Sequence, residues 1–138
     1  MSGRVAYLDT SAFVKLLVTE RESAELKAAL GRWPERASAT LLRTEAVRAL
    51  RRSGNGHLVG AARQLSSAMR LVRIDEPLLD RAGDLEPPEL RSLDAIHLAA
   101  ALALGPDLGV LLTYDDRLRE AASAQGLRVA SPGPPAGE

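Results

Sequence analysis

The chain has 138 residues, 46% of them hydrophobic and 26% charged, which is typical of a single globular domain. Its 18 basic and 18 acidic residues leave no net charge, which excludes an overall basic field for holding nucleic acid. The absence of cysteine excludes a disulfide framework and a thiolate metal site. We expect a cytoplasmic protein, because the most apolar stretch, 95–105, is too short to span a membrane and the N-terminus does not resemble a signal peptide.

The apolar pattern predicts strands that alternate with helices. The segment "RVAYLD" is continuously apolar before its acid, which is typical of a strand buried in a parallel sheet. Ser92 can cap the helix that follows it. In chain order, the predicted elements are a strand at 4–9, helices at 11–18 and 22–30, a strand at 37–40, helices at 41–53 and 57–70, a strand at 70–74, helices at 76–85 and 92–104, a strand at 109–113, a helix at 116–124 and a strand at 127–131.

These elements predict an α/β fold with three layers, α/β/α, around a central, mainly parallel sheet of about four or five strands. We expect one domain over residues 1–131 and a disordered C-terminal tail over 132–138, where proline and glycine dominate.

Acidic residues stand where the carboxyl ends of the predicted elements meet. Asp9 ends the first strand, and Asp115 and Asp116 follow the strand 109–113. Glu45 and Asp94 lie near the starts of two helices, where a single acid usually does no more than compensate the helix dipole. Because ligands of parallel sheets bind beyond the carboxyl ends of the strands, we expect these acids to converge there.

Several carboxylates close together cannot all stay ionised at neutral pH without a cation. Oxygen ligands without cysteine favour a hard divalent ion, Mg²⁺ or Mn²⁺. Such an ion lowers the pKa of a bound water and stabilises charge on a phosphoryl group. The sequence therefore predicts a metal site suited to phosphodiester chemistry.

Four segments, "YLDTSAFVKLL", "TEAVRAL", "LDAIHLAAA" and "LLTYDD", resemble in order and spacing the four acidic motifs of PIN-domain nucleases, most closely the VapC-type toxins. The T-x-D spacing in the last segment favours Asp115 over Asp116. The resemblance implies a catalytic quartet with two supporting hydroxyls: Asp9, Glu45, Asp94 and Asp115, with Ser11 and Thr113. We expect the three aspartates to bind the metal, while Glu45 either joins them or holds a bound water.

The same resemblance implies a cytoplasmic, metal-dependent endoribonuclease that is dimeric, leaves 5′-phosphates and is inhibited by a cognate VapB-type antitoxin. Six arginines and no acid occupy residues 46–74, and three of them, Arg48, Arg51 and Arg52, are candidates for guiding RNA phosphates to the metal. Alternatively they form a solvated face, with Arg48 paired to Glu45.

The apolar residues Phe13, Leu16, Leu17 and Val18 crowd the first helix, which suggests either a partner helix or cover by the same chain.

Asp94 and His97 are one helical turn apart, as in the Glu-x-x-His motif of di-iron bundles, but that site needs the motif twice. We therefore expect His97 to be packed or hydrogen-bonded, and His57 to lie in a loop.

Two other functions remain open. Asp9 could be the nucleophile of an aspartyl-phosphate phosphatase or phosphoacceptor domain, but the only lysines, Lys15 and Lys27, come too early in the chain for that site. A PIN-like binding module without catalysis would be expected to lack a carboxylate, and none is missing. Metal-dependent RNA cleavage is expected of only one of the three, the ribonuclease.

Overall fold

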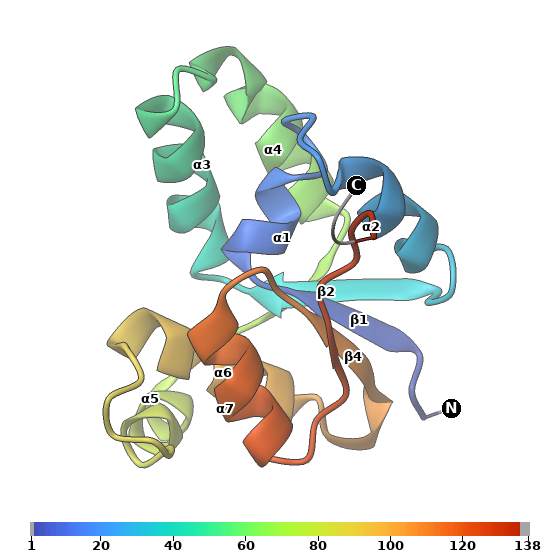
Figure 1. The fold of residues 1–138 in the computed structure, drawn as a ribbon. Coiled ribbons are helices and arrows are strands. Elements are labelled where there is room, and N and C mark those ends of the chain that lie inside the picture. Colours follow the sequence, from blue (N-terminus) through green and yellow to red (C-terminus); the bar gives the residue numbers. More distant parts are fainter. Residues whose placement is uncertain (1, 136–138) are drawn as a thin grey trace.

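A five-stranded sheet forms the centre of the protein, whose computed structural model describes residues 2–135 (Figure 1). Its strands are β1 Val5–Leu8, β2 Glu35–Ala39, β3 Arg70–Val72, β4 Leu108–Leu112 and β5 Val129–Ala130. They lie in the order β3-β2-β1-β4-β5, and each neighbouring pair is parallel. The predicted parallel sheet is therefore confirmed.

Helices cover both faces of the sheet. They are α1 Thr10–Val14, α2 Ser23–Leu30, α3 Leu42–Arg52, α4 Val59–Ser67, α5 Glu76–Gly83, α6 Ser92–Ala103 and α7 Asp116–Ala124, with short 3₁₀ turns at Gly56–Leu58 and Gly105–Asp107. Figure 1 shows α1 to α4 on one side of the sheet and α5 to α7 on the other. This arrangement confirms the three-layer α/β/α fold.

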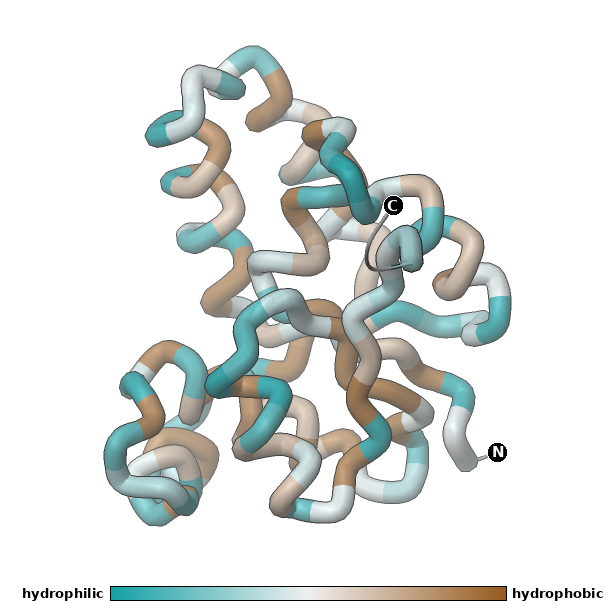
Figure 2. Tube along the Cα trace, viewed as in Figure 1, coloured by the Kyte–Doolittle hydropathy of each residue, from teal (hydrophilic) through white to brown (hydrophobic). Residues whose placement is uncertain are grey.

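The central strand β1 is buried on both faces, which explains its continuous apolar sequence. Val5 and Tyr7 pack in the core beneath α5, α6 and α7, whereas Ala6 and Leu8 pack toward α1 and α2. Burying a large apolar side chain contributes about 1.5–3 kcal/mol. In Figure 2, hydrophobic residues follow the central strands, and hydrophobic and hydrophilic residues alternate around the turns of α3.

The helix α1 is shorter than the predicted helix 11–18, because it ends at Val14. The amides of Leu16 and Leu17 bond to carbonyls three residues earlier, which tightens the chain into a 3₁₀-like turn. Phe13 and Leu17 pack against α3 and α4. Helices of the same chain thus cover much of this apolar surface.

Two further local predictions are wrong. Ser92 is the first residue of α6 rather than its cap, since Arg91 occupies the cap position and no side chain caps this end. The predicted helix 57–70 is reduced to α4, which begins at Val59, and His57 lies in the preceding 3₁₀ turn rather than in an irregular loop.

Residues 136–138 of the predicted tail lie outside the described residues, so the tail and the domain boundary at residue 131 stay predictions. Within residues 2–135, no helix is both long and apolar enough to cross a membrane.

Candidate active site at the carboxyl edge of the sheet

Asp9 is buried at the carboxyl end of β1 and caps α1. Its Oδ1 accepts hydrogen bonds from the Ser11 hydroxyl at 2.6 Å and from the Ala12 amide at 3.0 Å. Its Oδ2 accepts one from the Thr113 hydroxyl at 2.6 Å. Burial raises the pKa of Asp9, although these three hydrogen bonds oppose the rise. Asp9 is therefore rigidly held and costly to ionise.

The two predicted supporting hydroxyls also join β1 to the segment that follows β4. Ser11 Oγ accepts a hydrogen bond from the Tyr114 amide at 2.9 Å, and Thr113 Oγ1 accepts one from the Asp115 amide at 3.0 Å. Each hydroxyl thus donates to Asp9 and receives from the chain next to Asp115. These hydrogen bonds connect the carboxyl ends of β1 and β4 beside Asp9 and Asp115.

Of the two adjacent acids after β4, only Asp115 faces the other carboxylates. Its Oδ1 caps α7, and its Oδ2 lies 3.4 Å from Arg91 Nη2. Arg91 Nε in turn lies 3.6 Å from Asp94 Oδ2. Asp116 instead pairs with Arg119 in the next turn and leaves 78% of its side chain exposed.

Asp94 lies in the first turn of α6 and is the least satisfied of these acids. Its Oδ2 is buried and accepts no hydrogen bond. Burial raises the pKa of Asp94, and the charges of Asp115 and Asp9 raise it further, against the opposing charge of Arg91. Three aspartates from two strand ends and one helix therefore act electrostatically on one another.

Glu45, in the first turn of α3, has a different environment. Its Oε1 accepts hydrogen bonds from the Thr10 hydroxyl and from His97 Nε2, each at 2.6 Å. Burial acts to raise the pKa of Glu45, but the hydrogen bonds from His97 and Thr10 outweigh it and the pKa is lowered. His97 is buried, and its Nδ1 lies 2.7 Å from the Tyr7 hydroxyl, so the prediction that it is hydrogen-bonded is confirmed.

The aspartates fit a hard divalent ion by the chemistry of their donors and by the unpartnered oxygen of Asp94. As the side chains stand, no three Asp, Glu or His groups within the described residues are gathered closely enough to hold an ion. Asp94 and Asp115 flank the exposed guanidinium of Arg91, whose positive charge lies between them.

The three arginines proposed to contact RNA are exposed on α3. At 3.6 residues per turn, Arg48 and Arg52 lie on the Glu45 side of the helix, whereas Arg51 is rotated away from it. None of the three pairs with Glu45 within the described residues, so the alternative pairing of Arg48 with Glu45 is not observed.

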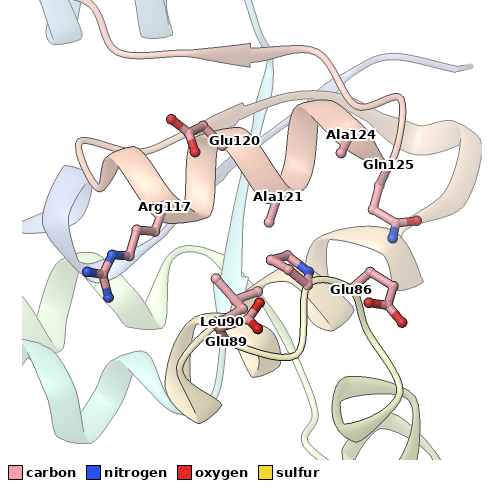
Figure 3. A pocket seen from close by; sticks show the side chains of 9 residues that line it. Glu86, Glu89, Leu90, Arg117, Glu120, Ala121, Ala124 and Gln125 are labelled. Carbon is pink, nitrogen blue, oxygen red and sulfur yellow. The ribbon is translucent and has the colours of Figure 1, made fainter.

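A cavity of about 770 Å³ lies between α7 and the loop 86–90 (Figure 3). Arg117 on α7 and Gln125, which directly follows that helix, stand at its two ends, and Glu86 and Glu89 come from the loop. None of the four predicted catalytic carboxylates lines this cavity.

Sequence reasoning missed three contributors to the site: Tyr7, Thr10 and Arg91. Thr10 stands beside Asp9 in the first motif, yet it donates to Glu45, 35 residues away. Arg91 lies in a mainly acidic stretch of the sequence, 75–94, so the composition of this stretch does not indicate that Arg91 pairs with Asp94 and Asp115. Its position three residues before Asp94 was the available signal, because residues so spaced face each other on a helix.

Comparison with known proteins identifies the family of the chain. The model of the PIN domain family matches residues 6–124. Ribonuclease VapC46 of Mycobacterium tuberculosis is 49% identical, over 91% of this chain and 96% of that protein. Ribonuclease VapC47 of the same species is 40% identical, over 92% and 96%. The chain therefore belongs to the PIN-domain family and, within it, to the VapC ribonucleases.

Solved structures show the same fold. Mycobacterium tuberculosis VapC20, described as a toxin that cleaves the sarcin-ricin loop, aligns with a TM-score of 0.73 over 92% of this chain and 99% of its own, at 19% identity. A chain of a toxin–antitoxin complex from Klebsiella pneumoniae aligns with a TM-score of 0.69 over 92% and 97%, at 25% identity.

Proposed function

We propose that this chain is the toxin of a VapBC-type pair and hydrolyses RNA phosphodiesters with Mg²⁺ or Mn²⁺. The observation that carries the proposal is the buried Oδ2 of Asp94, which accepts no hydrogen bond and lies in a group of aspartates whose mutual repulsion is opposed only by the exposed guanidinium of Arg91. The family relationship supplies the class of substrate.

In this proposal Asp9, Asp94 and Asp115 hold the ion, and Glu45 joins them or holds a water. The bound ion would acidify a water and stabilise charge on the scissile phosphate. Ser11 and Thr113 fix the carboxylate of Asp9 through both of its oxygens. Glu45 stays ionised through the donors on its Oε1, which leaves its other oxygen to orient a water by accepting a hydrogen bond.

Asp115 and Asp116 provide a matched test, because they are neighbours that differ in their orientation. Asp115→Asn should abolish metal-dependent cleavage of a mixed RNA substrate, measured with Mg²⁺ or Mn²⁺ and with EDTA as blank. Asp116→Asn removes the same charge from an exposed, paired position and should leave cleavage unchanged. Equal activity of the two folded variants would contradict the assignment of Asp115, and a wild type that never cleaves RNA would contradict the ribonuclease function itself.

The aspartyl-phosphate alternative receives no support from the surroundings of Asp9. Lys15, the nearer of the two lysines in sequence, pairs with Glu20 and Glu22 and lies over the ring of Tyr114 instead.

We further propose a cytoplasmic protein that forms a homodimer and binds a cognate antitoxin. A fold neighbour comes from a toxin–antitoxin complex, which supports the second part. Sedimentation of the purified chain, alone and with the product of an adjacent small gene, should show a dimer and then a larger complex. A monomer at micromolar concentration would contradict the dimer.

We propose that the arginines of α3 guide RNA phosphates, with Arg48 and Arg52 contributing most because they share the side of Glu45. The double variant Arg48→Gln/Arg52→Gln should weaken RNA binding across sequences and reduce its salt dependence, by a slope of up to about one for each phosphate that is no longer neutralised. Arg43 and Arg63 line a separate cavity and give a control with the same charge change. If Arg48→Gln/Arg52→Gln binds RNA as tightly as wild type at several salt concentrations, these arginines do not contact RNA and only form a solvated surface.

A further inference from the structure

A chain of hydrogen bonds links three layers of the fold to the candidate site. Tyr7 on β1 contacts His97 on α6 at 2.7 Å, and His97 contacts Glu45 on α3 at 2.6 Å. Tyr7 and His97 are buried, and their rings meet edge to face with centroids 5.9 Å apart. The motif "LDAIHLAAA" is otherwise apolar after its aspartate, so this histidine is a polar exception on a buried helix.

The protons of this chain can be assigned from the groups involved. An ionised carboxylate only accepts hydrogen bonds, so His97 Nε2 carries the proton that it shares with Glu45. When the ring is neutral, its Nδ1 accepts a hydrogen bond from the Tyr7 hydroxyl. With the Thr10 hydroxyl also donating to Glu45 Oε1, each donor has an acceptor and no buried nitrogen is unpaired.

The result is an asymmetric carboxylate. Oε1 of Glu45 accepts both hydrogen bonds, whereas Oε2 accepts none within the described residues and is not among their buried unpartnered atoms. A glutamate side chain has three rotatable bonds, so without these contacts it could exchange its two oxygens or turn away. Two fixed donors on one oxygen restrict it to a single orientation.

We propose that His97, oriented by Tyr7, is a positioning residue that holds Glu45 with Oε1 engaged and only Oε2 free to meet water or ion in the active site. This inference rests on the proposed ribonuclease function but concerns a residue outside the acidic quartet. Its action is analogous to that of the outer partners that orient the ligands of metal sites, whose loss typically costs about 10–100-fold in activity or affinity.

Two substitutions of His97 separate positioning from packing. Glutamine places an N–H₂ group near the position of Nε2 and can still donate to Glu45, whereas the shorter asparagine reaches only the position of Nδ1. For metal-dependent RNA cleavage, we expect His97→Asn to lower kcat by about 10–100-fold with little change in KM. His97→Gln should retain most of the activity. Far-UV circular dichroism and the melting temperature identify variants that fold.

Similar activity of the two folded variants, whether lost or kept in both, would overturn the proposal, because only glutamine can donate a hydrogen bond to Glu45 from the position of Nε2. Should His97→Asn fail to fold, Tyr7→Phe tests the same arrangement, since it removes only the donor to Nδ1. Tyr7→Phe should lower kcat by less than His97→Asn does, because the hydrogen bond from His97 to Glu45 is kept, and KM should again change little. An unchanged kcat would overturn the role of Tyr7.

A measurement on the metal-free protein is independent of catalysis. The ¹⁵N chemical shifts of His97 should show a protonated Nε2 and a bare, hydrogen-bonded Nδ1, and Tyr7→Phe should move only the Nδ1 signal toward that of a free nitrogen. A bare Nε2 would overturn the proposal whatever the activity. If the shifts agree but the wild type cleaves no RNA, the ribonuclease function fails while the assigned contact stands.

Discussion

The candidate site has two halves that the protein treats in opposite ways. In the aspartate half, burial and mutual repulsion raise the pKa of Asp94, and its Oδ2 lacks a hydrogen bond. In the glutamate half, donors from β1, α1 and α6 form a network that ends on Glu45 and lowers its pKa. The fold itself supplies hydrogen bonds to Glu45 and leaves Oδ2 of Asp94 without one, at the position where we propose that a cation binds. Crowded acids therefore need not share one role.

The largest expected effect comes from the aspartate half. Asp94→Asn keeps the shape of the side chain but removes an anionic ligand, so cleavage of RNA with Mg²⁺ or Mn²⁺ should fall by orders of magnitude. Cleavage is measured on folded protein at saturating metal. Asp80 is exposed on α5, and Asp80→Asn gives a control that should cleave at the wild-type rate. Undiminished cleavage by Asp94→Asn would remove Asp94 from the site.

A smaller effect concerns the pH dependence of stability in metal-free protein. The raised pKa values of Asp9 and Asp94 contribute stability below their ordinary value of 3.8, and this contribution is lost as the pH rises through the raised values. The lowered pKa of Glu45 works in reverse: its contribution is present above 4.5 and is lost as the pH falls through the lowered value.

Denaturant unfolding across the acid range checks the sign given for Asp94. The stability of Asp94→Asn relative to wild type should increase as the pH rises from 3.8 toward neutrality, and Mg²⁺ should stabilise the wild type more than this variant. A difference in unfolding free energy between Asp94→Asn and wild type that stays constant with pH would show that Asp94 is ordinarily solvated.

The smallest effect concerns Arg91, which is 67% exposed between Asp94 and Asp115. Its charge partly replaces that of a metal ion, so Arg91→Gln should raise the affinity for Mg²⁺. The gain should not exceed about fivefold, because exposed ion pairs contribute about 0.2–1 kcal/mol. Calorimetric titration without RNA measures it, and Arg81→Gln on α5 is the matched control. A lower affinity would mean that Arg91 supports the site rather than competing for it.

The sequence was sufficient to predict the parallel sheet, because continuous apolar runs such as Val5–Leu8 identify strands buried on both faces. The four acids could be proposed from the sequence because strand ends and helix starts are local features. The contacts around Glu45 could not be predicted in the same way, because Thr10 and Glu45 are 35 residues apart and Tyr7 and His97 are 90 residues apart. Such partners depend on how the layers pack, which local periodicity does not specify.

The most direct test compares two changes of carboxylate to amide in metal-free protein at neutral pH. Asp94→Asn should raise the melting temperature, because it relieves repulsion and the cost of a buried charge. Glu45→Gln should lower it, since hydrogen bonds to a charged group contribute about 1.5–3 kcal/mol and the amide replaces that charge. Shifts of opposite sign are the predicted result. Shifts of the same sign in both folded variants would contradict the division of the site into a half that needs a cation and a half that does not.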